Sequence, residues 1–226
     1  MNETPPPNFD RLAGIYRWME WLSFGPFLHR TRCAFLPELS GARNALLLGD
    51  GDGRFTAALL HANPAVQITA VDASAAMLQA LLRRARDCAG RIQTLHADAR
   101  SFRPASEASY DLIATHFFLD CLTTEEIRAL AARIRPHLTP GALWLLSDFT
   151  IPPNSYGRIL ARPLISLLYR AFGLLTGLRI RLLPDHASAL SGSGFLLRAR
   201  RGFLGGLLLA EQWQAANIKA MLKSPN

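Results

Sequence analysis

NALLLGDGDG, residues 44–53, is the stretch of this 226-residue chain that decides its fold. Its apolar run, residues 45–48, has no polar alternation, which is typical of a strand buried on both faces. The glycines that follow at every second position let the chain turn sharply and let a bulky group approach the backbone. Residues 55–61 then have helical character. Strand, glycine-rich turn and helix together predict a nucleotide-binding unit, and a tight turn that binds nothing is the alternative.

The rest of the chain repeats this alternation of strand and helix. Further strands are predicted at residues 66–71, 91–95, 110–115 and 142–146, and helices at residues 75–87 and 123–135. Thr123 and Glu126 have the spacing of a capping box at the start of the second helix. Strands that alternate with helices predict a parallel sheet with right-handed crossovers. Residues 194–201 and 206–213, with a glycine-rich turn between them, predict a closing antiparallel hairpin.

Acidic residues follow two of these strands. Asp72 lies about 20 residues beyond the glycines, where a carboxylate can accept both hydroxyls of a ribose. Because Ser74 is placed to cap the next helix, Asp72 is predicted to be left for a ligand. Asp98 follows the third strand. In an open α/β sheet ligands lie outside the carboxyl ends of the strands, so both acids are predicted at the ligand-binding edge.

Composition narrows the class of protein. The net charge is +8, but the excess is arginine spread along the chain, which favours a solvated surface over a nucleic-acid site. The three cysteines, Cys33, Cys88 and Cys121, form no CxxC pair, so we expect a reducing, cytoplasmic setting and no metal site. The N-terminus, MNETPPPNFD, is not a signal peptide, and no uncharged run reaches the ~20 residues that span a bilayer.

Two further segments have helical patterns outside the alternation. Residues 9–39 are rich in aromatic side chains and are broken at Gly25-Pro26, which predicts an N-terminal helical cap. This cap either covers a pocket or packs on the core. Residues 155–178 form an amphipathic pattern, with arginines on one face and leucines on the other. A lid, a helix packed on the body and a peripheral contact with a lipid surface are the alternatives for this segment.

With these motifs in this order, the chain resembles the class I S-adenosylmethionine (SAM)-dependent methyltransferases. Its two ends are loosely similar to ubiquinone/menaquinone C-methyltransferases. The resemblance implies an α/β, Rossmann-like fold: a mostly parallel seven-stranded sheet with a C-terminal antiparallel hairpin and helical caps. It also implies a cap over residues 1–40 and a SAM-binding domain over residues 41–226, which includes a helical lid insertion at about residues 155–185.

The resemblance also implies which residues hold the cofactor, SAM. The glycines would wrap its methionine and ribose, Asp72 would hold the ribose hydroxyls, and Asp98 would meet the adenine amino group. The full set of predicted contacts is Gly49, Asp50, Gly51, Gly53, Asp72, Ala73, Met77, Asp98, Ala99, Thr115 and His116. One position departs from the family, which usually has an acid where this chain has Leu47. Asp50 or Asp52 is the candidate replacement for that acid.

The expected chemistry is direct displacement of the methyl group from a sulfonium, for which a protein supplies alignment and a dry site. Aromatic faces attract a sulfonium, and Tyr16, Trp18 and Phe117 are candidates for that contact. An oxygen or carbon acid would need a base, and His116 and Asp120 at the end of the fourth strand are the catalytic candidates together with Tyr16. His186, which follows Asp185, is a further candidate base with a less favourable placement. A cofactor-wall role for His116 and a capping role for Asp120 are the alternatives.

The sequence therefore predicts an enzyme that methylates a small, apolar acceptor, quinone-like or lipidic, and does not act on nucleic acid. Residues 115–120, THFFLD, lack the Asn/Asp-Pro-Pro-Tyr/Phe motif of methyltransferases that act on adenine or glutamine amides. An NAD-type Rossmann oxidoreductase is an alternative, although the glycines follow G-x-G-x-G and not G-x-G-x-x-G. A SAM-binding protein without catalytic activity is the other, and the sequence predicts no oligomeric state.

Overall fold

The computed structural model describes residues 26–152 and 183–216 of the chain. The predicted N-terminal cap is therefore described only from residue 26 onward, and Tyr16 and Trp18 lie outside the described residues. Residues 155–182, which make up most of the predicted lid, also lie outside them. Within the two described ranges, no helix is both long enough and apolar enough to cross a membrane.

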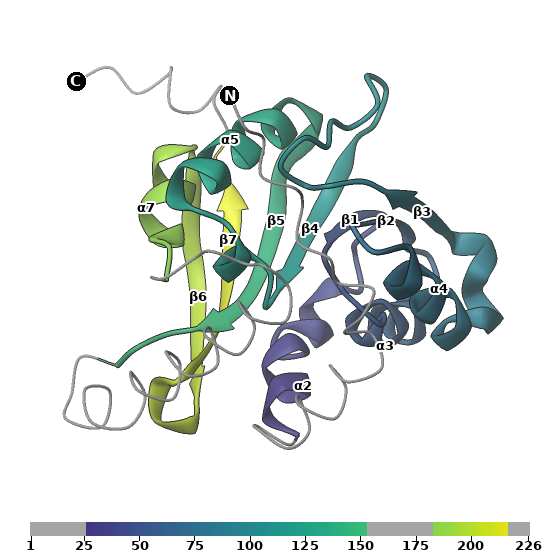
Figure 1. Ribbon diagram of the computed structural model, residues 1–226, viewed down its shortest axis with the longest axis horizontal. Helices are drawn as coiled ribbons and strands as arrows, with labels where there is room; N and C mark the ends of the chain where they lie inside the picture. The colour runs from purple at the N-terminus through teal and green to yellow at the C-terminus, as the bar shows by residue number, and fades with distance from the viewer. Residues whose placement is uncertain (1–25, 153–182, 217–226) are drawn as a thin grey trace.

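The described residues form one seven-stranded sheet in the order β3-β2-β1-β4-β5-β7-β6 (Figure 1). Its strands are β1 (Asn44–Leu48), β2 (Gln67–Asp72), β3 (Ile92–His96), β4 (Tyr110–His116), β5 (Leu138–Phe149), β6 (Phe195–Phe203) and β7 (Leu208–Ala215). Strands β1 to β5 pair in parallel, and β7 runs antiparallel to both β5 and β6. The predicted mixed sheet with a closing antiparallel hairpin is confirmed.

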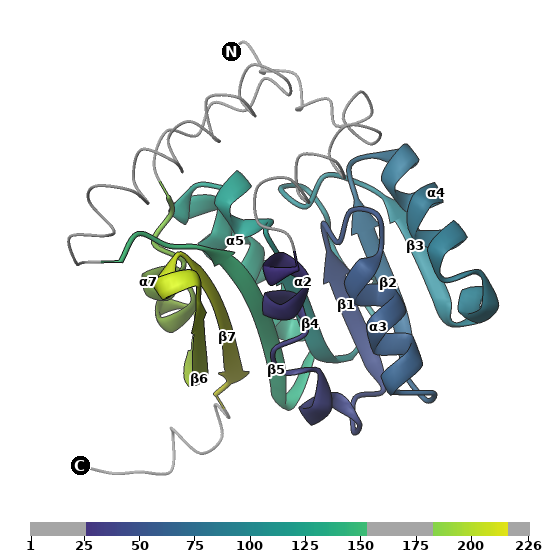
Figure 2. The same cartoon turned by 90° about the horizontal axis from the view of Figure 1, so that it is seen from below.

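The helices cover both faces of this sheet (Figure 2). They are α2 (Phe27–Arg32), α3 (Arg54–Ala62), α4 (Ala75–Arg84), α5 (Thr124–Ile134) and α7 (His186–Gly192). On one face Phe55 and Leu59 of α3 pack with Leu47 of β1. On the other face, Ile127 of α5 and Leu190 of α7 pack with the strand side chains that point in the opposite direction. Helices α2, α3 and α4 thus form one layer, and α5 and α7 form the other.

Strand β1 lies in the middle of these layers, between β2 and β4. Its residues 45–48 are at most 1% exposed, and they alternate between the two cores. This two-sided burial explains why the apolar run carries no polar alternation. The carboxyl ends of β1, β2, β3, β4 and β5 meet at one edge of the sheet, because all five strands are parallel.

The boundaries of β5 and α4 differ clearly from the sequence prediction. The Pro140-Gly141 turn lies inside β5, where the pairing of Tyr110 with Leu138 shifts register and Gly141 takes a φ of 79°. A glycine at an irregularity in a strand can adopt this backbone without strain. Helix α4 ends at Arg84 and not at Asp87, and the 3-10 turn η3 (Arg86–Arg91) follows it. Arg91 ties that turn to α3 by donating to carbonyl oxygens at the end of the helix.

Candidate functional site

The glycine-rich turn between β1 and α3 has the geometry that only glycine adopts without strain. Gly49, Gly51 and Gly53 have φ values of 67°, 57° and 77°. This is the left-handed region, where a Cβ atom would clash with the neighbouring carbonyl oxygen. The N–H of Gly49 donates to the carbonyl oxygen of Val71 at 2.9 Å, which fixes the turn against the end of β2.

The three glycines have different surroundings. The ring of Phe118 lies against Gly49, so that a Cβ at position 49 would stand 2.2 Å from its Cδ2. A Cβ at position 53 would stand 2.8 Å from the Cα of Leu81, which means that Gly53 allows α4 to pack closely on the turn. For a Cβ at position 51 the nearest atom would be the Sδ of Met77, 4.0 Å away. The backbone is therefore open to a ligand at Gly51.

Asp72 ends β2 beside this turn. Its Oδ1 accepts a hydrogen bond from the N–H of Ser74 at 2.8 Å. Burial raises the pKa of Asp72 to about 6, although hydrogen bonds from the backbone of Ser74 and Gly51 act in the opposite direction. Ser74 caps α4 by accepting from the N–H of Met77 at 3.2 Å, as the sequence predicted. Asp72 is thus a half-buried carboxylate that the cap of the next helix does not use.

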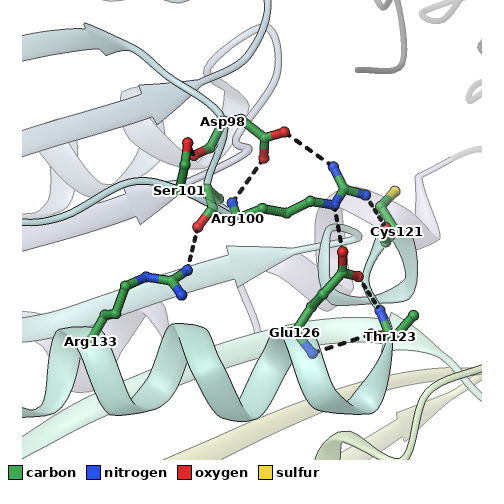
Figure 3. Close-up of polar contacts among 8 residues, drawn as sticks. Asp98, Arg100, Ser101, Cys121, Thr123, Glu126 and Arg133 are labelled. Atoms are coloured by element: carbon green, nitrogen blue, oxygen red, sulfur yellow. Dashed lines mark hydrogen bonds and ion pairs between the residues drawn. The ribbon is translucent and has the colours of Figure 1, made fainter. Parts of the chain in front are cut away.

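Asp98 follows β3 and belongs to a polar network (Figure 3). Its Oδ1 accepts from the N–H of Arg100 at 2.8 Å, and its Oδ2 pairs with the Arg100 guanidinium at 3.4 Å. The same guanidinium donates to Oε1 of Glu126 and to the carbonyl oxygen of Cys121. Glu126 in turn completes the predicted capping box with Thr123. Arg100 therefore connects Asp98 to the start of α5.

The other predicted contacts lie around this edge. Met77 is buried in the first turn of α4 and faces Gly51. Ala73 bonds through its carbonyl oxygen to Nε2 of His96 at 3.0 Å. Ala99 is buried, and its carbonyl oxygen accepts from Arg133 at 2.9 Å. Thr115 is buried too, and its hydroxyl accepts from Nε1 of Trp144 at 2.9 Å.

His116, the last residue of β4, points into the layer of α2 and α3. Its Nδ1 lies 2.9 Å from Oγ of Ser147, and its ring packs on Phe55 with a centroid distance of 4.3 Å. Burial lowers the pKa of His116 to about 3, and the nearby charge of Arg32 lowers it further. The imidazole is therefore uncharged at neutral pH. Its Nε2 is buried and makes no hydrogen bond within the described residues.

Asp120 lies on the other side of the sheet. Its N–H donates at 3.1 Å to Oδ2 of Asp148, the last but one residue of β5, on the face covered by α5 and α7. Asp148 is 2% exposed, and burial together with the charge of Asp120 raises its pKa well above the ordinary value. The structure thus separates the two candidate bases from the fourth strand end: His116 lies under α3, and Asp120 lies beside Asp148.

Asp50 and Asp52 occupy different environments within the turn. Asp52 pairs with Arg84 at 2.6 Å on the surface of α4. Asp50 uses Oδ2 to accept from the N–H and the hydroxyl of Thr56, at 2.8 and 2.6 Å. Its Oδ1 is buried and makes no hydrogen bond within the described part of the chain. This carboxylate oxygen lies at an open glycine turn and can accept a hydrogen bond from an ammonium group. Asp50 is therefore a better candidate than Asp52 to replace the acid missing at Leu47.

Sequence reasoning missed Arg32 near this position. Arg32 ends α2 and is 7% exposed, and its guanidinium lies 5.0 Å from the ring centroid of Phe117. Its charge also lowers the pKa of Asp50, although burial is the larger effect and leaves that pKa raised. An arginine and an aspartate together suit the carboxylate and ammonium of an amino acid. The sequence held no signal for this pair, because α2 reaches the turn only through the tertiary fold.

Phe117 itself has a strained backbone, with a φ of 54° that is unusual for a bulky residue. Its N–H donates to the carbonyl oxygen of Ser147 at 2.6 Å, and its ring contacts Phe149 with a centroid distance of 5.2 Å. Strain of this kind persists only where the surrounding structure imposes it, and it gathers at functional sites. Here it holds an aromatic ring at the end of β4.

Comparisons with known proteins agree with this geometry. Residues 46–144 match the family model described as a methyltransferase domain. None of the curated proteins matches the chain. An O-methyltransferase family protein from Burkholderia thailandensis aligns with a TM-score of 0.65 at 18% identity, over 94% of this chain and 65% of that one. This chain thus spans about two thirds of that protein's length.

Two further solved structures have the same fold. NodS, an N-methyltransferase from Bradyrhizobium japonicum WM9 in complex with S-adenosylhomocysteine, aligns with a TM-score of 0.61 at 16% identity, over 84% of this chain and 88% of that one. The SAM-dependent methyltransferase SibL aligns with a TM-score of 0.66 at 20% identity, over 96% of this chain and 64% of that one. At these identities the likeness concerns the fold.

The strand order with an antiparallel β7 is the class I methyltransferase fold. The family match covers the glycine turn and both acidic strand ends, so this part of the chain is similar to a methyltransferase domain.

Proposed function

We propose that this enzyme transfers the methyl group of SAM to a small, mostly apolar acceptor, quinone-like or lipidic. One observation carries the proposal: an open glycine turn and two acidic strand ends share the carboxyl edge of a parallel sheet, next to a cluster of apolar side chains. Ligands of open α/β sheets bind at this edge. A compact site of this kind suits a small molecule and not a polymer.

The cofactor half of the site is proposed from the residues already described. Asp72 accepts the ribose hydroxyls, and Asp98, held by Arg100, faces the adenine amino group. Asp50 takes the methionine ammonium and Arg32 its carboxylate. Gly51 provides the space, since the nearest atom to a Cβ there is 4.0 Å away. His116, uncharged and buried, forms part of the wall on which the methionine end rests.

The acceptor half is proposed from an apolar cluster at the ends of β4 and β5 and the start of β7. Its members include Phe117, Phe149, Leu207 and Leu208, with Leu28 and Phe27 of α2 packed against them. Aromatic and aliphatic walls exclude water, which strengthens electrostatic interactions at the reacting atoms. The ring of Phe117 also suits a sulfonium, because aromatic faces attract cations. The chemistry is a methyl transfer from sulfur to the acceptor, for which the chain supplies alignment.

The test uses SAM labelled in its methyl group. The protein is incubated with the labelled SAM and an apolar extract of bacterial cells, and in parallel with total RNA. We expect label in the extract and none in the RNA. The matched control is Asp72→Asn, which should lose transfer while it stays folded. Label that appears only in RNA would contradict the acceptor class.

The two alternatives from the sequence have weaker support. The family match and the strand order favour a methyltransferase over a dinucleotide-dependent oxidoreductase. The observation that favours a SAM-binding protein without activity is Leu47, which replaces the usual acid. Asp50 supplies a carboxylate nearby and so weakens that alternative. Binding of SAM without turnover on a broad acceptor panel would favour that alternative.

A further inference from the structure

Helix α2 depends on the sheet for its position. It is six residues long, Pro26 at its start makes no side-chain cap, and its first turn holds no acidic residue. A helix this short is not stable by itself in water, because its first turn is costly to form. It lies against the face of the sheet that α3 also covers (Figure 2), and it contacts β5, β6 and β7. Contacts with these strands therefore decide where its last residue, Arg32, is held.

One of these contacts is a hydrogen bond to the last turn of α2. The hydroxyl of Ser147 in β5 donates to the carbonyl oxygen of Thr31 at 3.1 Å. Carbonyl groups in the last turn of a helix lack partners within the helix, and here Ser147 supplies one. Ser147 and Thr31 are at most 1% exposed, so water is kept away from this bond. Because Thr31 directly precedes Arg32, the bond fixes the backbone that carries the arginine.

The Ser147 hydroxyl is itself held by His116. The two residues are partners in the register of β4 and β5, and Nδ1 of His116 lies 2.9 Å from Oγ of Ser147. The one hydroxyl proton of Ser147 goes to the carbonyl oxygen of Thr31, which can only accept. Oγ therefore accepts from Nδ1, and His116 carries its proton on that atom. These two hydrogen bonds, from His116 to Ser147 and from Ser147 to Thr31, form what we call the relay.

Ser147 also holds Phe117, through its main chain. The N–H of Phe117 donates to the carbonyl oxygen of Ser147 at 2.6 Å. The guanidinium of Arg32 lies over the Phe117 ring, 5.0 Å from its centroid. The side chain of Ser147 thus fixes the backbone of Arg32, and its main chain fixes the ring that the guanidinium contacts. A single residue of β5 sets both sides of this contact.

The charge of Arg32 acts on the glycine turn. It lowers the pKa of Asp50, against the larger effect of burial, and it contributes to the low pKa of His116. A guanidinium binds a carboxylate best through two parallel hydrogen bonds, and these need a defined geometry. The fixed position of α2 therefore matters for how well Arg32 can bind a carboxylate at this turn.

We propose that the relay positions Arg32 and thereby gives the site its selectivity for the carboxylate of SAM. The inference rests on the proposed function, in which Arg32 binds this carboxylate. Ser147 is a positioning residue, since it acts on the cofactor only through α2. A buried hydroxyl that only stabilised the fold would affect every ligand of the site alike, so the choice between two ligands separates the two roles.

The test uses SAM and decarboxylated SAM, which keeps the sulfonium and the ammonium but lacks the carboxylate. Calorimetry gives the dissociation constant of each for the full chain and three variants. Ser147→Ala removes the middle of the relay, and Arg32→Gln removes the charge. Ser193→Ala is the matched control, because the Ser193 hydroxyl donates to the carbonyl oxygen of Ala189 in α7 at 2.8 Å, which is the same kind of bond away from the glycine turn.

We expect the wild-type protein to prefer SAM over decarboxylated SAM by roughly tenfold or more, the usual effect of a hydrogen bond between charged groups. Arg32→Gln should lose most of this preference. Ser147→Ala should lower the preference by about fivefold, the factor in an equilibrium constant that corresponds to one net hydrogen bond. Its affinity for decarboxylated SAM should stay unchanged. Ser193→Ala should keep both wild-type constants.

Three results would overturn the inference and leave the proposed function in place. The first is a Ser147→Ala protein that binds both ligands more weakly by the same factor, since this is the mark of a structural role. The second is a Ser147→Ala protein with the wild-type preference. The third is a Ser193→Ala protein that loses the preference, because any lost hydrogen bond of this kind would then have the same effect.

A different result would contradict the proposed function. Wild-type protein that binds the two ligands equally would show that Arg32 does not bind the carboxylate, and the inference would fail with that assignment. If Ser147→Ala does not fold, nitrogen NMR of the wild-type protein decides, read on the imidazole that packs against Phe55. The relay requires an uncharged ring with its proton on Nδ1 at neutral pH, and a proton on Nε2 instead would overturn the inference.

Discussion

The carboxylate of Asp72 accepts a hydrogen bond from the backbone N–H of Ser74, 2.8 Å away, and this contact holds it at the end of β2 beside the glycine turn. Its pKa is raised to about 6, mainly by burial. Below that pH the group is protonated and offers one acceptor fewer to a ribose. We therefore expect the dissociation constant for SAM to rise about tenfold per pH unit well below pH 6, and to be flat above it.

Calorimetric titration with SAM at a series of pH values measures this dependence. Asp72→Asn should weaken SAM binding by roughly tenfold or more, since a hydrogen bond to a charged group contributes about 1.5–3 kcal/mol. The variant should also abolish the pH dependence. Asp87→Asn, at an exposed acid, should leave both unchanged. A flat curve for the wild-type protein would show that Asp72 does not hold the cofactor.

The glycine turn offers a matched pair of substitutions. Gly51→Ala places a methyl group in open space, so we expect a stability cost of about 1–2 kcal/mol from the left-handed backbone alone. SAM binding should nevertheless fall sharply, because the methyl group occupies the approach to the cofactor. Gly53→Ala meets Leu81 at 2.6–2.9 Å, including its Cα, and should cost about 3 kcal/mol or more in stability.

Urea unfolding and calorimetry together separate these two effects. The expected pattern is a Gly51 variant that is stable but binds poorly, and a Gly53 variant that is unstable. A Gly51→Ala protein that binds SAM as tightly as the wild-type protein would mean that the cofactor does not approach this backbone.

His116 should behave as a wall residue in kinetic experiments. Its pKa is lowered to about 3, so it stays uncharged across the pH range in which the enzyme is assayed. We expect His116→Asn, which can keep a donor for the Ser147 hydroxyl oxygen, to lower activity by the same factor at every pH from about 5 to 8. A variant that loses the acidic limb of the pH profile would instead identify His116 as the general base.

Thermal unfolding in the presence of SAM and of NADH distinguishes the two nucleotide cofactors. SAM at about 100 times its dissociation constant should stabilise the protein by ~2.7 kcal/mol, and the unfolding midpoint should rise accordingly. NADH at the same concentration should leave the midpoint unchanged. Stabilisation by NADH alone would favour the oxidoreductase alternative.

Features that depend on short stretches of chain could be predicted from the sequence. The two-sided burial of β1 follows from its apolar residues, and the cap at Ser74 follows from its position before α4. The capping box of Thr123 and Glu126 is equally local. The placement of Asp72 and Asp98 at one edge needed only the parallel order of the strands.

Features that depend on long-range packing could not be predicted. Arg100 bridges Asp98 to Glu126 because α5 lies beside the loop after β3, and nothing in the local pattern indicates that. The contact of His186 with Glu211 depends on the packing of α7 on the hairpin, where Glu211 pairs with Leu146 of β5. The packing of β4 against β5 places His116 and Asp120 on opposite faces of the sheet, although the sequence prediction put both at the end of the fourth strand.

The most direct test of the central claim is a crystal structure of the protein with S-adenosylhomocysteine. We expect the ribose hydroxyls within hydrogen-bonding distance of Asp72, the adenine amino group beside Asp98, and the amino acid end over Gly51 near Asp50 and Arg32. A ligand bound elsewhere, or bound at this edge with neither acid in contact, would contradict it.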